Sequence, residues 1–196
     1  MNREEKNIFI IFSIILSSIL LLICCYLLYV SYKYPLDYKE SIVTYSKEFD
    51  LDPSLVASII NAESRFDKEA VSNKGAVGLM QLMPSTAIYV ADILNRDFDI
   101  KDLTDADKNI LYGCCYLNYL NNKFEDNVAV LASYNAGEGI VKKWLLNKEY
   151  SKDGKTLDAI PYQETDNYVK QVLNSVRVYK NKLNNWHNEM FEYNKK

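Results

Sequence analysis

The hydrophobic pattern begins with an uninterrupted apolar run near the start of the chain. Residues 8–30 carry no charged side chain and are rich in Ile and Leu. A helix of about 20 such residues is long enough to cross the hydrocarbon core of a bilayer. We therefore expect a transmembrane helix over 8–30, after a short N-terminal segment, 1–7, and before a juxtamembrane linker, 31–37.

Two cleaved alternatives compete with a retained anchor. A secretory signal has a shorter apolar core followed by small residues, whereas this run ends in bulky tyrosines, with Tyr32 the last of them. A lipoprotein signal needs a small residue before its cysteine, but Ile23 precedes Cys24. A retained anchor is favoured, although the positive charges on the two sides of the run are nearly balanced and leave its orientation open.

Beyond the linker, apolar positions recur three or four residues apart, which is typical of amphipathic helices. No segment shows the alternation of a β-strand, residues 148–160 form a polar loop, and a polar tail occupies 184–196. The expected fold class is mainly α. The predicted helices run through Ile42 and Phe49, from Pro53 to Glu63, from Pro84 to about Leu94, from near Asp105 through Leu120, from Asn127 to Tyr134, through Ile140 and Leu145, and from Glu164 to Leu183.

Glu63 occupies an unusual place in this pattern. Asp52 and Pro53 mark the start of its helix, because Asp is a good N-cap and Pro fits the first helical position. The apolar face that includes Val56 and Ile60 reaches Glu63 when it is extended by one turn. Burial and the negative end of the helix dipole both disfavour the carboxylate, so we expect a raised pKa for Glu63. From periodicity alone, an ion pair with Arg65 remains an alternative role.

Composition narrows the possible chemistry. Lys and Arg number 23 against 26 for Asp and Glu, so no large basic field is available for nucleic acid. The cysteines form two adjacent pairs, Cys24-Cys25 and Cys114-Cys115, without the spacing of a metal or redox site. We expect no metal and no cofactor. Because His187 is the only histidine and lies in the polar tail, carboxyl groups are the candidate catalytic groups.

Four sequence blocks then point to a family. They occur in the order ESRF (63–66), GAVGLMQLMP (75–84, with Ser72 before it), SYNAG (133–137) and IPYQETDNYV (160–169). Together they resemble the soluble lytic transglycosylases of family 1, which have a goose-type lysozyme-like fold. Ser133 replaces the alanine that is usual in the third block. The resemblance covers 38–183, which we take as the catalytic domain.

The resemblance implies roles for individual residues. Glu63 would be both the acid and the base, and Ser72, Gln81 and Met83 would line the cleft beside it. Tyr134 and Asn135 would border the sugar, and Glu164 and Tyr168 would complete the lobe behind the cleft. The implied activity is cleavage of the β-1,4 bond between N-acetylmuramic acid and N-acetylglucosamine in peptidoglycan, without water, to give 1,6-anhydro ends. Such a substrate places the domain outside the cytoplasmic membrane and the N-terminus in the cytoplasm.

Two other functions remain open at this stage. A second carboxyl, with Asp67, Glu138 and Glu164 as candidates, would make the protein a hydrolytic muramidase on the same fold. The other hypothesis is that the protein is a wall-binding scaffold without catalytic activity. The sequence also leaves open the physiological process, any partner in a cell-envelope assembly, and cutting from strand ends or within strands.

Overall fold

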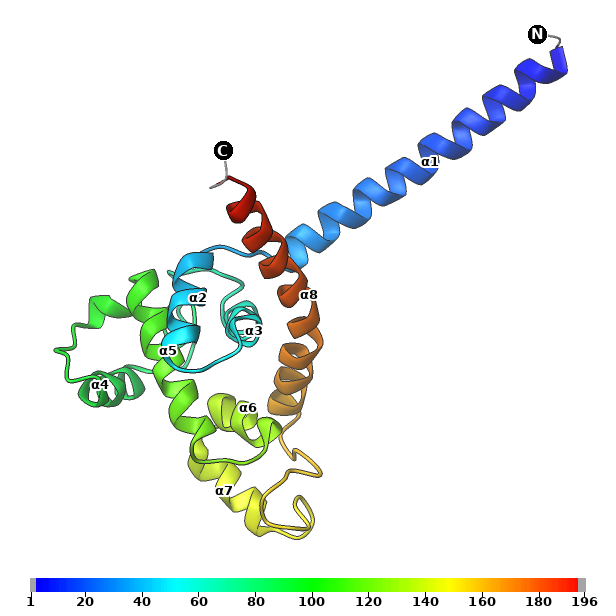
Figure 1. The fold of residues 1–196 in the computed structure, drawn as a ribbon. Coiled ribbons are helices and arrows are strands. Elements are labelled where there is room, and N and C mark those ends of the chain that lie inside the picture. Colours follow the sequence, from blue (N-terminus) through cyan, green and yellow to red (C-terminus); the bar gives the residue numbers. More distant parts are fainter. Residues whose placement is uncertain (1–2, 194–196) are drawn as a thin grey trace. The chain divides into compact units, whose positions relative to one another are not determined.

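The computed structural model describes residues 3–193, and their side chains as far as Asn188. The chain divides into two compact units, one ending at Pro35 and the other beginning at Leu36. The first unit is a single helix, α1 (Arg3–Lys33), in which no residue is buried (Figure 1). Within 3–193, α1 is the one helix long and apolar enough to cross a membrane. It contains the whole predicted span, 8–30.

The second unit is built from helices and loops, as the sequence predicts. Within the described residues there is no strand, only isolated bridges that pair Val77 with Val71 and with Leu82. The elements are α2 (Lys39–Glu48), α3 (Pro53–Glu63), α4 (Pro84–Ile93), the short 3₁₀ helix η1 (Ile100–Leu103), α5 (Ala106–Asn121), α6 (Asn127–Ala136), α7 (Glu138–Leu146) and α8 (Gln163–Tyr193).

Aspartates start three of these α-helices. The Asp52 side chain accepts a hydrogen bond from the backbone N–H of Ser54, and Pro53 occupies the first position of α3. Asp105 and Asp126 cap α5 and α6 in the same way. Each cap satisfies a backbone donor that the first turn of a helix leaves without a partner. The predicted starts of these helices are therefore confirmed by local chemistry.

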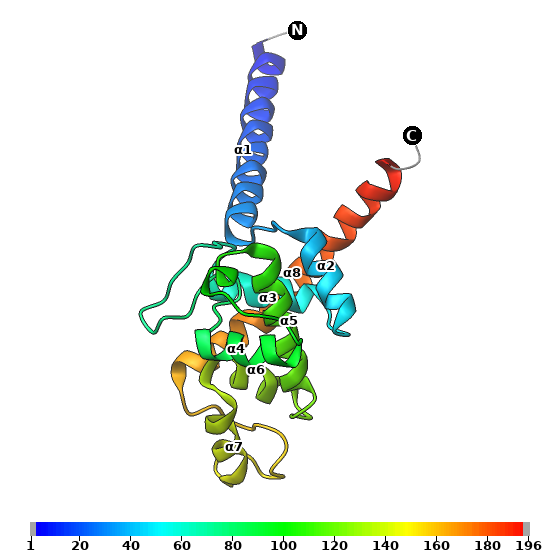
Figure 2. The same cartoon turned by 90° about the vertical axis from the view of Figure 1, so that its left-hand side faces the viewer.

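Helix α3 forms the centre of the core. It packs most extensively against α8 and also against α2, and Figures 1 and 2 show it enclosed by the other helices of this unit. Val56, Ile59 and Ile60 on α3 are fully buried. Tyr179 of α8 is also fully buried. The residue that ends α3 is thus held by the most buried element of the unit.

Two helices run further than predicted. Helix α6 continues two residues past Tyr134 to Ala136, and it stops where Gly137 adopts a φ of 90°. Helix α8 continues past Leu183 to Tyr193, through most of the predicted tail 184–196. That stretch contains neither Pro nor Gly, so nothing in its sequence interrupts the hydrogen bonds of a helix.

The cysteine pair of α5 lies in the core. Cys114 and Cys115 are both buried and unbonded, and burial raises the pKa of the Cys114 thiol. A thiol in such surroundings stays protonated and packs as a small apolar side chain.

Candidate active site

Glu63 is the last residue of α3, and the backbone turns sharply after it. The Ser64 side chain donates a hydrogen bond to the backbone carbonyl of Leu79 over 2.8 Å, which ties the end of the helix to a loop. Arg65 and Phe66 follow with positive φ angles of 54° and 68°. Left-handed backbone is costly for residues other than glycine and is often found at functional sites. This turn fixes the direction in which the chain leaves the carboxyl.

The surroundings of Glu63 favour the protonated acid. The residue keeps a partial opening to solvent, yet burial of its carboxyl raises the pKa to about 7. The Tyr168 hydroxyl acts in the opposite direction, and the charge of Glu164 adds to the increase. The raised pKa that we expected from the apolar helix face is therefore present. A carboxyl with a pKa near neutrality can both donate and accept a proton at physiological pH.

The loop after α3 is folded tightly against α5. Gly78 is needed there, because its φ is 82° and an added Cβ would come within 2.1 Å of the backbone oxygen of Leu103. Gln81 also has a positive φ, of 46°, and its side-chain amide donates hydrogen bonds to the carbonyls of Ala70 and Gly78. The Gln81 amide therefore holds the loop in shape.

Asn109 of α5 anchors the same loop, a role that no sequence pattern indicates. Its side chain is fully buried and accepts a hydrogen bond from the backbone N–H of Met80 over 2.8 Å. Its amide group donates to the carbonyls of Val77 and Leu103. One buried amide thus satisfies three backbone groups that would otherwise lack partners.

Four of the predicted cleft residues come together in one pocket of about 230 Å³. We call it the cleft pocket, and its walls include Gln81, Met83, Tyr134 and Asn135. Thr86 and Tyr116 also line it, and sequence reasoning missed both. Tyr116 lies on a helix between buried Cys115 and Leu117. From the sequence pattern it cannot be told apart from an ordinary core tyrosine.

Tyr134 and Asn135 are both held by hydrogen bonds to other elements. The Tyr134 hydroxyl donates to the carbonyl of Met80 over 2.9 Å. The Asn135 side-chain oxygen accepts from the Thr165 hydroxyl of α8 over 2.8 Å. Because its oxygen is engaged, the NH₂ group of Asn135 is the part that can donate to a ligand in the pocket.

Tyr168 and Glu164 approach Glu63 from α8. The Tyr168 hydroxyl is buried and forms no hydrogen bond of normal geometry with any described residue, although it lies close enough to lower the pKa of Glu63. Its own pKa is raised well above the usual value by burial and by the charge of Glu63. Tyr168 therefore remains a donor, aimed at the region of the carboxyl. Glu164 is exposed and forms a 3.8 Å ion pair with Lys74.

Ser72 does not line the cleft pocket. Its hydroxyl accepts a hydrogen bond from the backbone N–H of Ala76, and the backbone N–H of Ser72 donates to the carbonyl of Ala76. These bonds close the turn that contains Lys74. Ser72 thus shapes the loop beside Glu164, and its hydroxyl is engaged in that turn.

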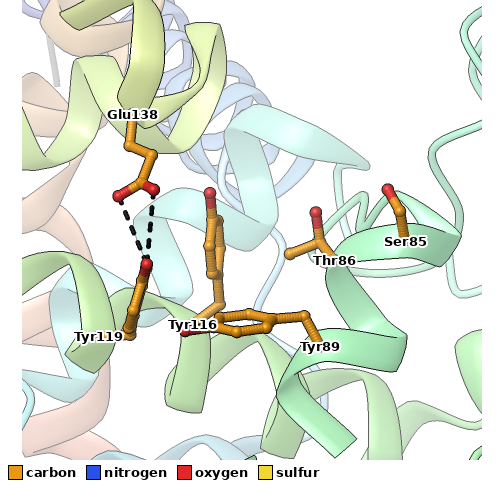
Figure 3. Close-up of a pocket in the computed structure, with 6 residues that line it drawn as sticks. All are labelled: Ser85, Thr86, Tyr89, Tyr116, Tyr119 and Glu138. Carbon is orange, nitrogen blue, oxygen red and sulfur yellow. Dashed lines mark hydrogen bonds between the residues drawn. The ribbon is translucent and has the colours of Figure 1, made fainter. Parts of the chain in front are cut away.

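The other candidate carboxyls occupy different surroundings. Asp67 is exposed and accepts a hydrogen bond from the backbone of Glu69. Glu138 pairs with Lys123 and Lys142 and lines a second pocket, shown in Figure 3. Of these acids, only Glu164 is near enough to affect the pKa of Glu63. Across residues 3–193 no three His, Cys, Asp or Glu side chains are grouped so as to hold a metal ion.

This arrangement agrees with comparisons to known proteins. The family model for the transglycosylase SLT domain matches residues 40–157, more than half of the chain. The chain belongs to the transglycosylase SLT domain family. The soluble lytic murein transglycosylase of Salmonella typhimurium is 35% identical to this SLT protein over 149 residues, which cover 72% of this chain and 22% of that protein. The membrane-bound lytic murein transglycosylase C of Haemophilus ducreyi is 34% identical over 109 residues, 50% of this chain and 30% of that protein.

Solved structures confirm the predicted lysozyme-like helical fold of the SLT domain. An inactive mutant of the lytic transglycosylase Slt from Pseudomonas aeruginosa aligns with a TM-score of 0.71 at 31% identity, covering 79% of this chain and 26% of that one. The 70 kDa soluble lytic transglycosylase of Escherichia coli aligns with a TM-score of 0.68 at 30% identity, covering 76% and 25%. The chain thus spans about a quarter of the length of these relatives.

Proposed function

We propose that this protein is a membrane-anchored lytic transglycosylase that cleaves peptidoglycan glycan strands, with Glu63 as its acid and base. The observation that carries the proposal is a carboxyl with a pKa of about 7 at the end of the central helix. Tyr134 of the third block and Tyr168 of the fourth each have a pKa that burial and the charge of Glu63 raise. Family membership supplies the reaction class. The relatives described above are lytic murein transglycosylases.

The first step would use the protonated form of Glu63. It donates its proton to the oxygen that joins C1 of N-acetylmuramic acid to C4 of N-acetylglucosamine, and the C1–O bond breaks. The N-acetylglucosamine leaves with a hydroxyl at C4. The 2-acetamido group of the muramoyl ring stabilises the positive charge that develops at C1. Desolvation of the carboxyl, which raises its pKa, is what makes the acid available at neutral pH.

The second step would use the carboxylate that remains. Glu63 takes the proton of the muramoyl C6 hydroxyl, and that oxygen forms a bond to C1. The product is a 1,6-anhydromuramoyl end, and Glu63 is again protonated. No water is consumed, so a single carboxyl can serve both steps. Holding the C6 hydroxyl near C1 replaces a bimolecular attack by water with an intramolecular one.

Residues of the cleft pocket would orient the sugar for these steps. The NH₂ group of Asn135 is placed to donate to a sugar oxygen, while Met83, which is 39% exposed, offers an apolar wall. The buried Tyr168 hydroxyl can donate to the carboxylate that the first step creates, because it has no other partner of normal geometry among the described residues. For Ser72 we propose a structural role, in which its hydrogen bonds to Ala76 hold the shape of the neighbouring loop.

The anchor supports a location at the outer face of the cytoplasmic membrane. Residues 8–30 lie within α1, the candidate span, and we propose that they hold the protein in the bilayer with residues 1–7 in the cytoplasm. The domain 38–183 would then face the peptidoglycan. Protease treatment of intact spheroplasts tests this orientation, since a domain beyond Lys33 that stays protected would contradict it.

Product analysis tests the reaction itself. Full-length protein in detergent is incubated with purified peptidoglycan, and the released fragments are analysed by mass spectrometry. We expect anhydro ends, one water lighter than reducing ends, and no release by the Glu63→Gln variant. Glu125→Gln is a matched control, because Glu125 is an exposed carboxylate paired with Lys155 on the surface. Reducing ends would identify a hydrolytic muramidase, and an active Glu63→Gln variant would exclude Glu63 as the acid.

A further inference from the structure

A third pocket lies at the start of the second unit. It has a volume of about 390 Å³ and is lined by residues 36–41 and by Trp186 of α8. We call it the juxtamembrane pocket. None of these residues lines the cleft pocket, and the volume falls in the range of small-ligand sites, roughly 300–1,000 Å³. The proposed reaction leaves this pocket without a role.

The covalent chain keeps the juxtamembrane pocket near the proposed anchor. Lys33 is the last residue of α1, and Leu36, which lines the pocket, follows three residues later. An extended chain advances about 3.5 Å per residue, so Leu36 lies at most about 11 Å from Lys33 in any orientation of the second unit. A pocket tethered in this way stays close to the boundary between bilayer and water when α1 spans the membrane.

The C-terminal half of α8 contributes basic and aromatic groups beside this pocket. Residues 167–188 contain no Asp or Glu and four Lys or Arg side chains. Trp186, which belongs to this stretch, is half-buried and lines the pocket. Tryptophan is enriched at the interfaces of membranes, where its ring lies at the level of the headgroups. Basic helices are attracted to the phosphates of lipids.

Two lysines place positive charges close together at the pocket. Lys39 lines it, and Lys182 of α8 is half-buried. Burial and the charge of Lys39 lower the pKa of Lys182. Within residues 3–188 neither lysine forms an ion pair. Neighbouring like charges repel each other, and an anion bound between them removes this cost.

Acidic side chains also line the juxtamembrane pocket. Asp37 and Glu40 are both exposed. An ionised carboxylate only accepts hydrogen bonds, so these two groups favour a ligand that carries donors or a positive charge. The face of the Trp186 ring also attracts cations. The pocket therefore presents positive groups to an anion and negative groups to a cation, which complements a zwitterionic ligand.

We infer that the juxtamembrane pocket binds the phosphoethanolamine headgroup of a phospholipid in the membrane that α1 crosses. The headgroup phosphate lies between Lys39 and Lys182, and its ammonium group faces Asp37 and Glu40. The inference rests on the proposed anchor, because the anchor brings the pocket to a bilayer. It also goes beyond the proposed function, since a bound headgroup restricts the directions in which the catalytic domain can point.

Titration with short-chain lipids tests the site. Full-length protein in detergent is titrated with dihexanoylphosphatidylethanolamine while tryptophan fluorescence is recorded. The chain has two tryptophans, and Trp186→Phe identifies the part of the signal that comes from the pocket. We expect the choline and glycerol lipids of the same chain length to bind about tenfold more weakly. Choline lacks an N–H donor, and the glycerol headgroup lacks a positive charge. Equal binding of the three lipids would overturn the site.

Charge variants provide a second readout. Lys39→Gln/Lys182→Gln should raise the Kd for the phosphoethanolamine lipid about tenfold, and an unchanged Kd would overturn the site. Lys143→Gln/Lys152→Gln is the matched control. Both of its lysines are exposed, and Figures 1 and 2 show α7 at the opposite end of this unit from the C-terminal end of α8. Urea unfolding checks that both variants fold, and the comparison of lipids on wild type needs neither variant.

Flotation tests the anchor separately. Full-length protein reconstituted in vesicles should stay with the lipid after an alkaline wash, because α1 spans the bilayer. A protein that is washed off contradicts the anchor and, with it, the membrane as the source of the headgroup. A protein that stays with the vesicles but shows no preference among the three headgroups overturns this site alone. Cleavage of peptidoglycan in detergent should be the same in wild type and Lys39→Gln/Lys182→Gln, so the proposed reaction is measured independently.

Discussion

The hydroxyl of Tyr134 donates a hydrogen bond to the backbone carbonyl of Met80 across 2.9 Å. This bond joins α6 to the loop that follows α3, and the Met80 backbone N–H is held at the same time by Asn109. Both polar groups of the Met80 backbone are therefore fixed by side chains from other helices. The loop that carries Gln81 and Met83 is positioned from two sides before any substrate binds, which is the preorganisation that a catalytic cleft requires.

Replacing Tyr134 by Phe should remove the hydrogen bond that positions the Met80 loop while keeping the packing of the ring. The ring stays in place, but the Met80 carbonyl loses its partner, which costs about 1–3 kcal/mol of unfolding free energy. A shift of the cleft wall should also lower kcat/KM by roughly tenfold or more. Urea unfolding and kinetics on peptidoglycan measure the two effects. Tyr162→Phe, which removes a hydroxyl from an exposed ring, should change neither, and an unaffected Tyr134→Phe protein would show that this bond is dispensable.

The pKa of Glu63 makes stability depend on pH. The folded state holds a proton up to about pH 7, whereas an unfolded glutamate releases it near its ordinary value of about 4.3. The folded protein therefore loses stability as pH rises from about 4.5 to 7. Each unit of difference between the two pKa values corresponds to about 1.4 kcal/mol of unfolding free energy, so the total loss is on the order of 3 kcal/mol. Below this window the penalty is absent.

Glu63→Gln should remove this dependence. Measured by denaturant unfolding at several pH values, the variant should gain on the wild type between pH 5 and 8, and the two should differ least in acid. Glu125→Gln controls for the loss of a surface carboxylate. If the unfolding free energies of wild type and Glu63→Gln changed in parallel with pH, the carboxyl of Glu63 would have an ordinary pKa.

The pH profile of the reaction reports the same group. Because the first step needs protonated Glu63, kcat/KM should fall on the alkaline side with an apparent pKa near 7. The charge of Glu164 raises the pKa of Glu63 and the Tyr168 hydroxyl lowers it. Glu164→Gln should therefore move the alkaline limb to lower pH, and Tyr168→Phe should move it to higher pH. Shifts in the same direction would contradict this electrostatic assignment.

Glu164 also decides between the two reactions on this fold. If it activated water, its removal would abolish cleavage at every pH. If Glu63 acts alone, Glu164→Gln should still yield anhydro ends, with a shifted profile. Lys74→Met is the useful comparison, because it removes the 3.8 Å ion partner of Glu164 and leaves the carboxylate. The exposed pair itself should contribute less than about 1 kcal/mol to stability.

Gly113 and Met80 form a complementary pair in the core. A Cβ at position 113 would lie 2.1 Å from the sulfur of Met80, so Gly113→Ala should destabilise the domain by about 1–3 kcal/mol through overpacking. Met80→Ala should cost about 2–5 kcal/mol through the cavity it leaves. The unfolding free energy lost by the double variant should be smaller than the sum of the two single losses, by about 1 kcal/mol or more, because the truncated Met80 side chain makes room for the added methyl group. Strict additivity in urea unfolding would show that the two residues do not interact.

Local chemistry explains why much of the fold could be predicted. Asp52 followed by Pro53 specifies a helix start through contacts within one turn, and the apolar face that leads to Glu63 needs only the helical period. Such signals lie within a few residues of the feature they determine. The cleft residues Gln81, Met83, Tyr134 and Asn135 could be named in advance because their sequence blocks resemble a family.

The remaining features depend on contacts between distant segments. Asn109 is an unremarkable polar residue in the pattern of α5, and its role exists only because the loop of Val77 and Met80 folds against it. Tyr89 and Tyr119 are separated by 30 positions of sequence and meet only through the packing of α4 on α5. Helical periodicity cannot distinguish such tyrosines from core residues. The extension of α8 to Tyr193 was missed because a polar composition does not by itself end a helix.

Helix α5 carries both Tyr116, which lines the cleft pocket, and Asn109, which holds the loop of Val77 and Met80. A helix moves as a stiff rod, so a change that displaces α5 would displace the loop and the pocket wall together. Substitutions on the buried face of α5 should therefore alter the cleft pocket even where the substituted residue does not line it.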